Sequence, residues 1–203
     1  MATRPSYSFV LFAALAIVIS ISATAFGQSA TKTDFNSIKI KNFGQMDDRF
    51  YRGAQPDKDA YKQLSDLGIK TIIDLTDNPK SYEKSSVEAL GMRYVHIPMS
   101  DKRYPESTSI EQFLKLVDDP TTGKFYVHCA GGRHRTGVMG AVYRFNHYNW
   151  NFDQVYSEMK NYDFYTRWGH GDLKKFVEDY ATSYQHNSAT AAAAGAATGV
   201  KQK

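Results

Sequence analysis

One stretch of the sequence decides the fold: His128-Cys129-Ala130-Gly131-Gly132-Arg133-His134-Arg135-Thr136-Gly137. The run before it, Lys124 to His128, is rich in aromatic and β-branched residues, which predicts a strand. The residues after it, Thr136 to Tyr148, carry apolar side chains around most of a helical circumference, which predicts a buried helix. The stretch is therefore the turn that leads from a buried strand into a buried helix.

A turn in this position favours an anion. Backbone N–H groups at a helix N-terminus have no partner within the helix, and a tight loop directs them toward one point. Gly131 and Gly132 are expected to let the backbone turn where side chains would clash. Arg135, six residues after Cys129, would close over bound oxygens with its planar guanidinium. Phosphate is the anion that fits this set of donors.

The positive potential of these N–H groups and of Arg135 also acts on Cys129, the only cysteine in the chain. Helix N-termini and nearby cations lower the pKa of a thiol from about 8.5, so a thiolate is expected at neutral pH. A thiolate beneath a bound phosphate is a nucleophile directed at phosphorus. The Thr136 hydroxyl could donate a hydrogen bond to the sulfur, and His128 is expected to order the loop rather than exchange protons. The alternative is a purely structural, buried cysteine in a glycine-rich turn. That interpretation would leave the cations Arg133, His134 and Arg135 unexplained.

The pattern His-Cys-x5-Arg-Thr resembles the signature loop of the cysteine-dependent protein tyrosine phosphatase superfamily, and its dual-specificity branch fits best. The run Gly132 to Gly137 is similar to the loop of plant-and-fungal-type atypical members, and Phe50 to Pro56 resembles an N-terminal element of bacterial members. The resemblance implies a phosphocysteine intermediate at Cys129, without a metal or organic cofactor. It also implies that phosphate is held by Arg135 and by the loop amides of Ala130, Gly131, Gly132, Arg133, His134 and Arg135.

Expulsion of a leaving group requires a proton donor. In the superfamily this is usually an Asp about thirty residues before the cysteine, and Asp101 lies twenty-eight residues before Cys129. Its loop follows a predicted strand, so it should emerge at the same sheet edge as the cysteine loop. Glu106 in the same loop is the first alternative. Asp74 sits on that edge too, and we interpret it as a structural hydrogen-bond acceptor.

The sequence indicates a phosphorylated substrate without naming one. Arg133 and His134 beside the phosphate favour a polyanion such as an inositol phosphate, as the resemblance also suggests, whereas the 14 Tyr and 12 Phe could line a slot for a phosphorylated protein side chain. A net charge of +4 is too mild to imply nucleic acid. Three alternatives stay open: a phosphate-binding module with weak catalysis, a rhodanese-like sulfurtransferase, and an arsenate reductase, which normally needs further thiols.

The body of the chain, residues 31–185, predicts one three-layer α/β domain with a largely parallel sheet. Strands are expected at 69–75, 93–97 and 124–128, with an antiparallel edge hairpin from 38–42 and 49–52. Helices are expected at 57–67, 82–90, around Ile110 to Val117 behind a Thr108-x-x-Glu111 capping box, at 136–148, and in two later amphipathic segments.

The two ends differ from the body. Residues 1–25 combine Arg4, an apolar run and the small residues Ala23-Thr24-Ala25, which is typical of a secretory signal and predicts export to a periplasm or the exterior. A retained membrane anchor is the alternative, and membrane contact is expected only in that case. Residues 186–203 are rich in Ala, Gly, Thr and Ser, which predicts a disordered tail.

Overall fold

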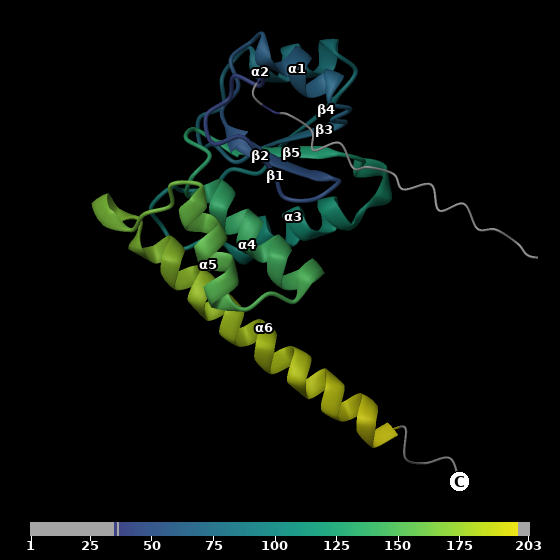
Figure 1. Cartoon of the computed structure of the whole chain (residues 1–203), viewed down its shortest axis with the longest axis vertical. Coiled ribbons are helices and arrows are strands. Elements are labelled where there is room, and N and C mark those ends of the chain that lie inside the picture. Colours follow the sequence, from purple (N-terminus) through teal and green to yellow (C-terminus); the bar gives the residue numbers. More distant parts are fainter. Residues whose placement is uncertain (1–34, 36, 199–203) are drawn as a thin grey trace, which may run out of the picture. The chain divides into compact units, whose positions relative to one another are not determined.

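The computed structural model describes residues 35 and 37–198, and within them the chain forms a five-stranded sheet (Figure 1). The spatial order is β1-β2-β5-β3-β4, and every neighbouring pair except β1–β2 is parallel. The strands are β1 (Gly44–Gln45), β2 (Phe50–Ala54), β3 (Thr71–Asp74), β4 (Arg93–His96) and β5 (Phe125–Cys129). The three predicted central strands and the largely parallel sheet are confirmed.

The predicted hairpin is shifted along the sequence. Its first strand is β1, which lies in the segment expected to connect the two strands, and 38–42 is not a strand. Its second strand, β2, pairs with β1 on one side and with β5 on the other, so it is an inner strand. The register places Ala54 opposite Cys129. The strand we expected at the sheet edge therefore flanks the cysteine directly.

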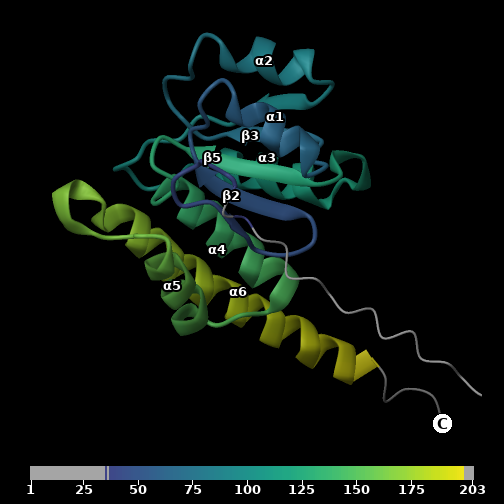
Figure 2. The ribbon, with the colours of Figure 1, turned by 45° about the horizontal axis from the view of Figure 1, so that its top comes forward.

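Helices cover both faces of the sheet (Figure 2). One face carries α1 (Ala60–Asp66) and α2 (Glu83–Ala89). The other carries α3 (Ser107–Asp118), α4 (Arg135–Tyr148), α5 (Phe152–Asn161) and α6 (Gly171–Thr198), and two short 3₁₀ turns lie at Pro120–Thr122 and Arg167–Gly169. Each predicted helix is present within a few residues of its expected bounds. The three-layer prediction is confirmed.

Alternation along the strands divides the core in two. Ile73 and Val127 point toward the cluster under α3 to α6, whereas Ile72 and Tyr126 point toward the cluster under α1 and α2. Both faces of β3 and β5 are thus buried, which explains why successive residues of these strands are apolar instead of alternating with polar ones, apart from Thr71, Asp74 and His128. The central helix α4 follows β5 directly and is buried from Arg135 to Phe145, as its apolar circumference predicts.

Two local predictions are wrong. The helix α3 begins at Ser107 with Glu106 as its N-cap, and no side chain caps it, so the Thr108 capping box does not form. The segment 186–198 is helical rather than disordered, because α6 continues to Thr198. Alanine has the highest helix propensity, and the Ala-rich run extends a helix that tertiary packing has already started.

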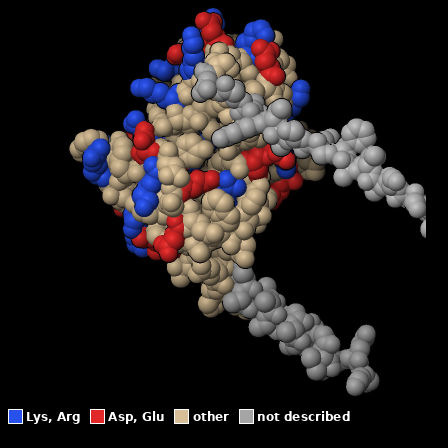
Figure 3. Space-filling view, in the orientation of Figure 1, with Lys and Arg blue, Asp and Glu red and all other residues tan. Residues whose placement is uncertain are grey.

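The predicted signal at residues 1–25 lies outside the described residues. Among the described helices, none is both long and apolar enough to cross a membrane. On the face shown in Figure 3, Lys and Arg side chains are interspersed with Asp and Glu. This mixed surface agrees with the mild net charge.

Candidate active site

The loop between β5 and α4 is fixed by one glycine. Gly132 has φ +66, and a Cβ atom there would lie 2.4 Å from the carbonyl carbon of Gly53 and 2.6 Å from the nitrogen of Ala54. Any side chain would collide with the backbone of β2. Gly131 is different, since its φ is ordinary and an added Cβ would come no closer than 3.8 Å to any neighbour. The steric need predicted for both glycines therefore holds only for Gly132.

The loop carbonyls are held from the β2 side. The Asn42 side-chain amide donates to Gly131 O at 2.9 Å, Arg52 Nη2 donates to Gly132 O at 2.8 Å, and the Gln55 N–H reaches Ala130 O at 3.4 Å. Within the described chain, no backbone N–H from Ala130 to His134 donates to a backbone carbonyl. The Gly131 N–H acts on the Cys129 sulfur, and the other N–H groups of the loop are available to an anion.

Sequence reasoning missed Arg52, although it lies in the quoted stretch Phe50 to Pro56. Its side chain is fully buried, and its guanidinium lies 4.0 Å from the centre of the Tyr162 ring. Burial lowers the pKa of Arg52, and the neighbouring Cys129 opposes this effect. Arginine is rarely buried unless it is paired. The only signal in the sequence was therefore a charged residue inside a predicted strand.

Cys129 ends β5 at the floor of this loop and is buried. Burial acts to raise the pKa of its thiol, but the Thr136 hydroxyl, the charge of Arg135 and the N–H groups of Thr136 and Gly131 outweigh burial and lower the pKa below its ordinary value. The Thr136 hydroxyl is also buried and has no formed hydrogen bond with any described residue, which leaves its proton available to the sulfur anion. The predicted environment for a thiolate is present.

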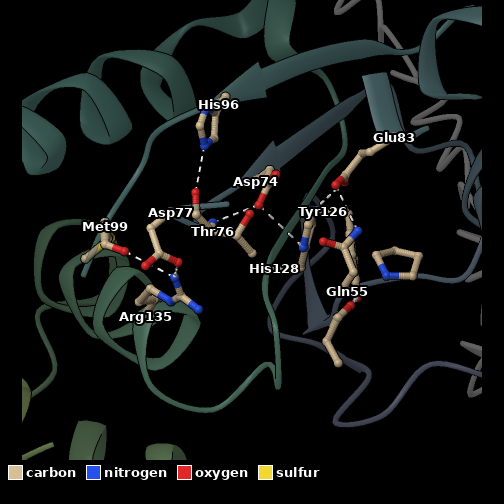
Figure 4. A network of polar contacts seen from close by, with 12 residues as sticks. Gln55, Asp74, Thr76, Asp77, Glu83, His96, Met99, Tyr126, His128 and Arg135 are labelled. Atoms are coloured by element: carbon tan, nitrogen blue, oxygen red, sulfur yellow. Dashed lines mark hydrogen bonds and ion pairs between the residues drawn. The ribbon is translucent and has the colours of Figure 1, made fainter. Parts of the chain in front are cut away.

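Arg135 is tied to two other loops (Figure 4). Its Nη1 donates to Asp77 Oδ1 at 2.8 Å and to Met99 O at 3.1 Å, whereas its buried Nε has no partner among the described residues. The hydrogen bond from Arg135 holds the pKa of Asp77 below its usual range, so Asp77 is ionised at neutral pH and is a poor proton donor. Sequence reasoning also missed Asp77, because only the fold brings β3 beside β5.

A cavity of about 150 Å³ opens above the sulfur, and we call it the catalytic cavity. It is lined by Asp101, Cys129, Ala130, Gly131, Arg133, His134, Arg135, Tyr165 and His170. Asp101 thus shares the cavity with the thiol, whereas Glu106 lines a separate small hollow behind the same loop. Asp74 accepts hydrogen bonds from the Thr76 N–H and the Tyr94 hydroxyl, each at 2.8 Å, which confirms its interpretation as a structural acceptor.

Two stacked imidazoles form one wall of the catalytic cavity. The rings of His134 and His170 lie 3.7 Å apart, centre to centre, and are almost parallel. Nδ1 of His170 lies 2.6 Å from the carbonyl oxygen of Asp101, so this nitrogen donates and holds the Asp101 loop. Burial, His170 and Arg133 lower the pKa of His134 to about 4. His134 is therefore neutral at physiological pH, and our expectation that it contributes a cation is wrong.

Beneath the loop, His128 is fully buried between two carboxylates. Its Nε2 lies 2.7 Å from Glu83 Oε1, and its Nδ1 lies 3.9 Å from Asp74 Oδ1. Potential ligand atoms of these three residues all lie within 4.8 Å of one another. However, both carboxylates already accept protein donors, since the Gln55 amide donates to Glu83 at 2.8 Å. Both carboxylates are therefore held by protein donors, whereas neither ring nitrogen of His128 forms a hydrogen bond within the described residues, and its role in ordering the loop stays a prediction.

Sequence comparison gives the family. The sequence model of the tyrosine phosphatase family matches residues 37–197. The chain belongs to the tyrosine phosphatase family. The match spans every strand and helix of this phosphatase described above, except the last residue of α6.

Individual relatives agree. The phosphatase is 29% identical over 127 residues to the probable tyrosine-protein phosphatase DG1060 of Dictyostelium discoideum, covering 60% of this chain and 75% of that protein. It is 25% identical over 131 residues to the dual specificity protein phosphatase TpbA of Pseudomonas aeruginosa, covering 64% of this chain and 56% of TpbA. It is also 25% identical over 136 residues to the inositol diphosphatase SIW14 of Saccharomyces cerevisiae, covering 63% of this chain but only 47% of SIW14.

Solved structures show the same fold. The catalytic domain of SIW14 from S. cerevisiae aligns with a TM-score of 0.60 at 22% identity, covering 68% of this phosphatase and 85% of that chain. TpbA from P. aeruginosa aligns with a TM-score of 0.59 at 22% identity, covering 69% and 84%. The dual-specificity-type fold expected from the cysteine loop is thereby confirmed.

Proposed function

We propose that this phosphatase hydrolyses phosphomonoesters through a phosphocysteine intermediate at Cys129. One observation carries the proposal: a thiol of lowered pKa lies at the floor of a cavity that Asp101 and Arg135 also line. A nucleophile, an anion-binding guanidinium and a carboxyl group thus converge on a space large enough for a phosphate. Neither a sulfurtransferase nor a passive binding module requires all three.

In the first step, the thiolate attacks phosphorus and an S–P bond forms as the bond from phosphorus to the leaving oxygen breaks. Asp101, protonated at this stage, gives its proton to that oxygen. The equatorial oxygens are stabilised by Arg135 and by the free N–H groups between Ala130 and His134. The loop N–H groups are in place before the substrate arrives, whereas Arg135 must be shared between the phosphate and Asp77 or released from Asp77.

In the second step, water attacks the phosphocysteine and Asp101, now a carboxylate, takes a proton from it. The S–P bond breaks and returns the thiolate. The Thr136 hydroxyl favours the sulfur anion and so makes it a better leaving group. Inorganic phosphate then leaves, and Arg135 is free to return to Asp77.

We infer a substrate that is either a phosphorylated protein side chain or a small phosphorylated metabolite. SIW14 bears the name of an inositol diphosphatase, and a TpbA structure holds phosphotyrosine. The half-buried Arg133 at the wall of the catalytic cavity favours a substrate with more than one negative charge. Its Nε lies 3.7 Å from Asp163, a distance too long for a hydrogen bond, so its charge is only partly compensated.

The direct test is release of phosphate from an aryl phosphate by the wild-type protein and by Cys129→Ser. We expect turnover by the wild type and its complete loss in the variant, which should still bind phosphate or vanadate. Equal turnover by both proteins would refute the nucleophile assignment. Binding without turnover by the wild type would instead favour the weakly catalytic phosphate-binding module.

We also propose that residues 1–25 direct export, on the basis of their charge and apolar pattern. Expression of the full chain in a bacterium with fractionation tests this. A mature form shortened by about 25 residues and located outside the cytoplasm is expected. An intact N-terminus on a membrane-bound form would favour the retained anchor, and an intact soluble cytoplasmic form would contradict export.

A further inference from the structure

A second hollow adjoins the catalytic cavity. It has a volume of about 530 Å³ and is lined by side chains that include Arg133, Lys160, Asp163, Tyr165, Arg167 and Trp168, and we call it the side hollow. Arg133 and Tyr165 line both spaces. A ligand that extends past these two side chains would therefore pass from the catalytic cavity into the side hollow.

The side hollow carries an excess of positive charge. Three cations, Arg133, Lys160 and Arg167, face one carboxylate, Asp163, whose side chain is 65% exposed. The contact of Asp163 with Arg133, at 3.7 Å, is the only ion pair among the side-hollow residues in the described chain. Such a surface attracts a further anionic group.

Arg167 is held in a way that leaves its donors free. Its guanidinium carbon lies 4.5 Å from the centre of the Trp168 ring and 5.0 Å from that of Tyr165. Stacking uses the faces of a guanidinium, whereas its N–H groups point outward from its edge. The contacts of this guanidinium within the described residues are with these two rings. The aromatic rings thus orient a cation for an external acceptor at no cost in hydrogen bonds.

Trp168 supports the same interpretation. Its side chain is 70% exposed, and its backbone has φ 59, a left-handed conformation that is strained for a bulky residue. An exposed side chain adds nothing to the hydrophobic core, and a strained backbone costs stability. Both are explained if the residue is there to hold Arg167 beside a ligand.

We propose that the side hollow binds a second phosphate group of a small-molecule substrate whose reacting phosphate occupies the catalytic cavity. This inference rests on the proposed function, because it places the reacting group above Cys129. Arg167 is its specificity residue, since it donates to the second phosphate without touching the reacting one. Arg133, between the two spaces, serves both groups.

Calorimetric titration of full-length Cys129→Ser protein tests the inference without needing turnover. The probes are alkane α,ω-bisphosphates of increasing length and the matching alkyl monophosphates. We expect a bisphosphate of suitable length to bind about tenfold more tightly than its monophosphate, because charge-assisted hydrogen bonds to a phosphate are among the stronger ones. Adding Arg167→Gln should bring this ratio close to one, while leaving monophosphate binding unchanged.

Arg93→Gln is the matched control, because Arg93 is an exposed arginine on β4, away from both spaces. It should leave the ratio at the value of the parent protein. Equal affinities for bisphosphates and monophosphates at every length would overturn the inference, and so would a ratio that survives Arg167→Gln. Aryl phosphate turnover by the wild type is a separate readout, so failure of the proposed function is distinguished from failure of the side hollow.

Discussion

Arg135 and Asp77 form an ion pair of 2.8 Å between Nη1 and Oδ1, which links the cysteine loop to the end of β3. The guanidinium is buried, whereas the side chain of Asp77 is 68% exposed. A phosphate that enters the catalytic cavity must therefore share this arginine with a carboxylate or displace that carboxylate. The pair sets how strongly the empty site attracts anions.

Asp77→Asn should tighten the binding of inorganic phosphate. The variant removes a competing negative charge that is largely exposed, so the gain is modest, about twofold to fivefold in the inhibition constant. The measurement is inhibition of aryl phosphate hydrolysis, with Asp66→Asn on the exposed face of α1 as the control. Weaker inhibition in Asp77→Asn would mean that Asp77 positions Arg135 for phosphate rather than competing for it.

Thr136→Val should raise the pKa of the Cys129 thiol, because a hydroxyl that favours the sulfur anion is lost. Alkylation by iodoacetamide follows the thiolate, so its midpoint should move to higher pH. Thr136→Ser keeps the hydroxyl and should restore the wild-type midpoint. A wild-type midpoint at or above about 8.5, the value of free cysteine, would refute the thiolate itself.

Asp101→Asn should slow the hydrolysis of alkyl phosphates by about 10²- to 10⁴-fold and spare nitrophenyl phosphate, because only poor leaving groups need a proton. Glu106→Gln is the matched variant, since Glu106 lies on the same loop but outside the catalytic cavity. It should leave both rates unchanged. The reverse pattern, with Glu106→Gln selective for poor leaving groups, would transfer the acid role to Glu106.

Glu83→Gln should destabilise the fold by about 3 kcal/mol, because it removes the negative charge from a buried contact with His128. Burial acts to raise the pKa of Glu83, but His128, Gln55 and Tyr61 outweigh it and hold the pKa below the ordinary value of 4.5. A carboxyl group of depressed pKa stabilises the fold above its unfolded pKa, and this contribution is lost as pH falls through the folded pKa.

Urea unfolding from pH 7 to pH 3 measures both effects. The wild type should lose stability below about pH 4.5, and Glu83→Gln should lack that part of the loss. Glu88→Gln, at a partly exposed position of the same helix, is the control. Equal unfolding free energies of wild type and Glu83→Gln at pH 7 would show that the contact with His128 contributes no net stability.

Periodicity was sufficient for most of the fold. The largely apolar run through β5 and the apolar side chains around most of α4 specify a buried strand and a buried helix, because local spacing decides which side chains share a face. Local spacing did not predict β1, because that strand is defined by its pairing with β2 and not by a pattern of apolar residues. It failed again in 186–198, where composition indicated disorder but helix propensity continued α6.

The chain's own order of residues indicated the proposed nucleophile, the proposed anion-binding arginine and the loop that carries them, since Cys129, Arg135 and Thr136 lie within eight positions and one turn brings them together. Only the tertiary structure decided that Arg135 pairs with Asp77, that Arg52 holds the loop from below and that His170 holds the Asp101 loop. These partners are separated by 58 to 80 positions in sequence. Contacts of that separation depend on strand order, which residue spacing does not encode.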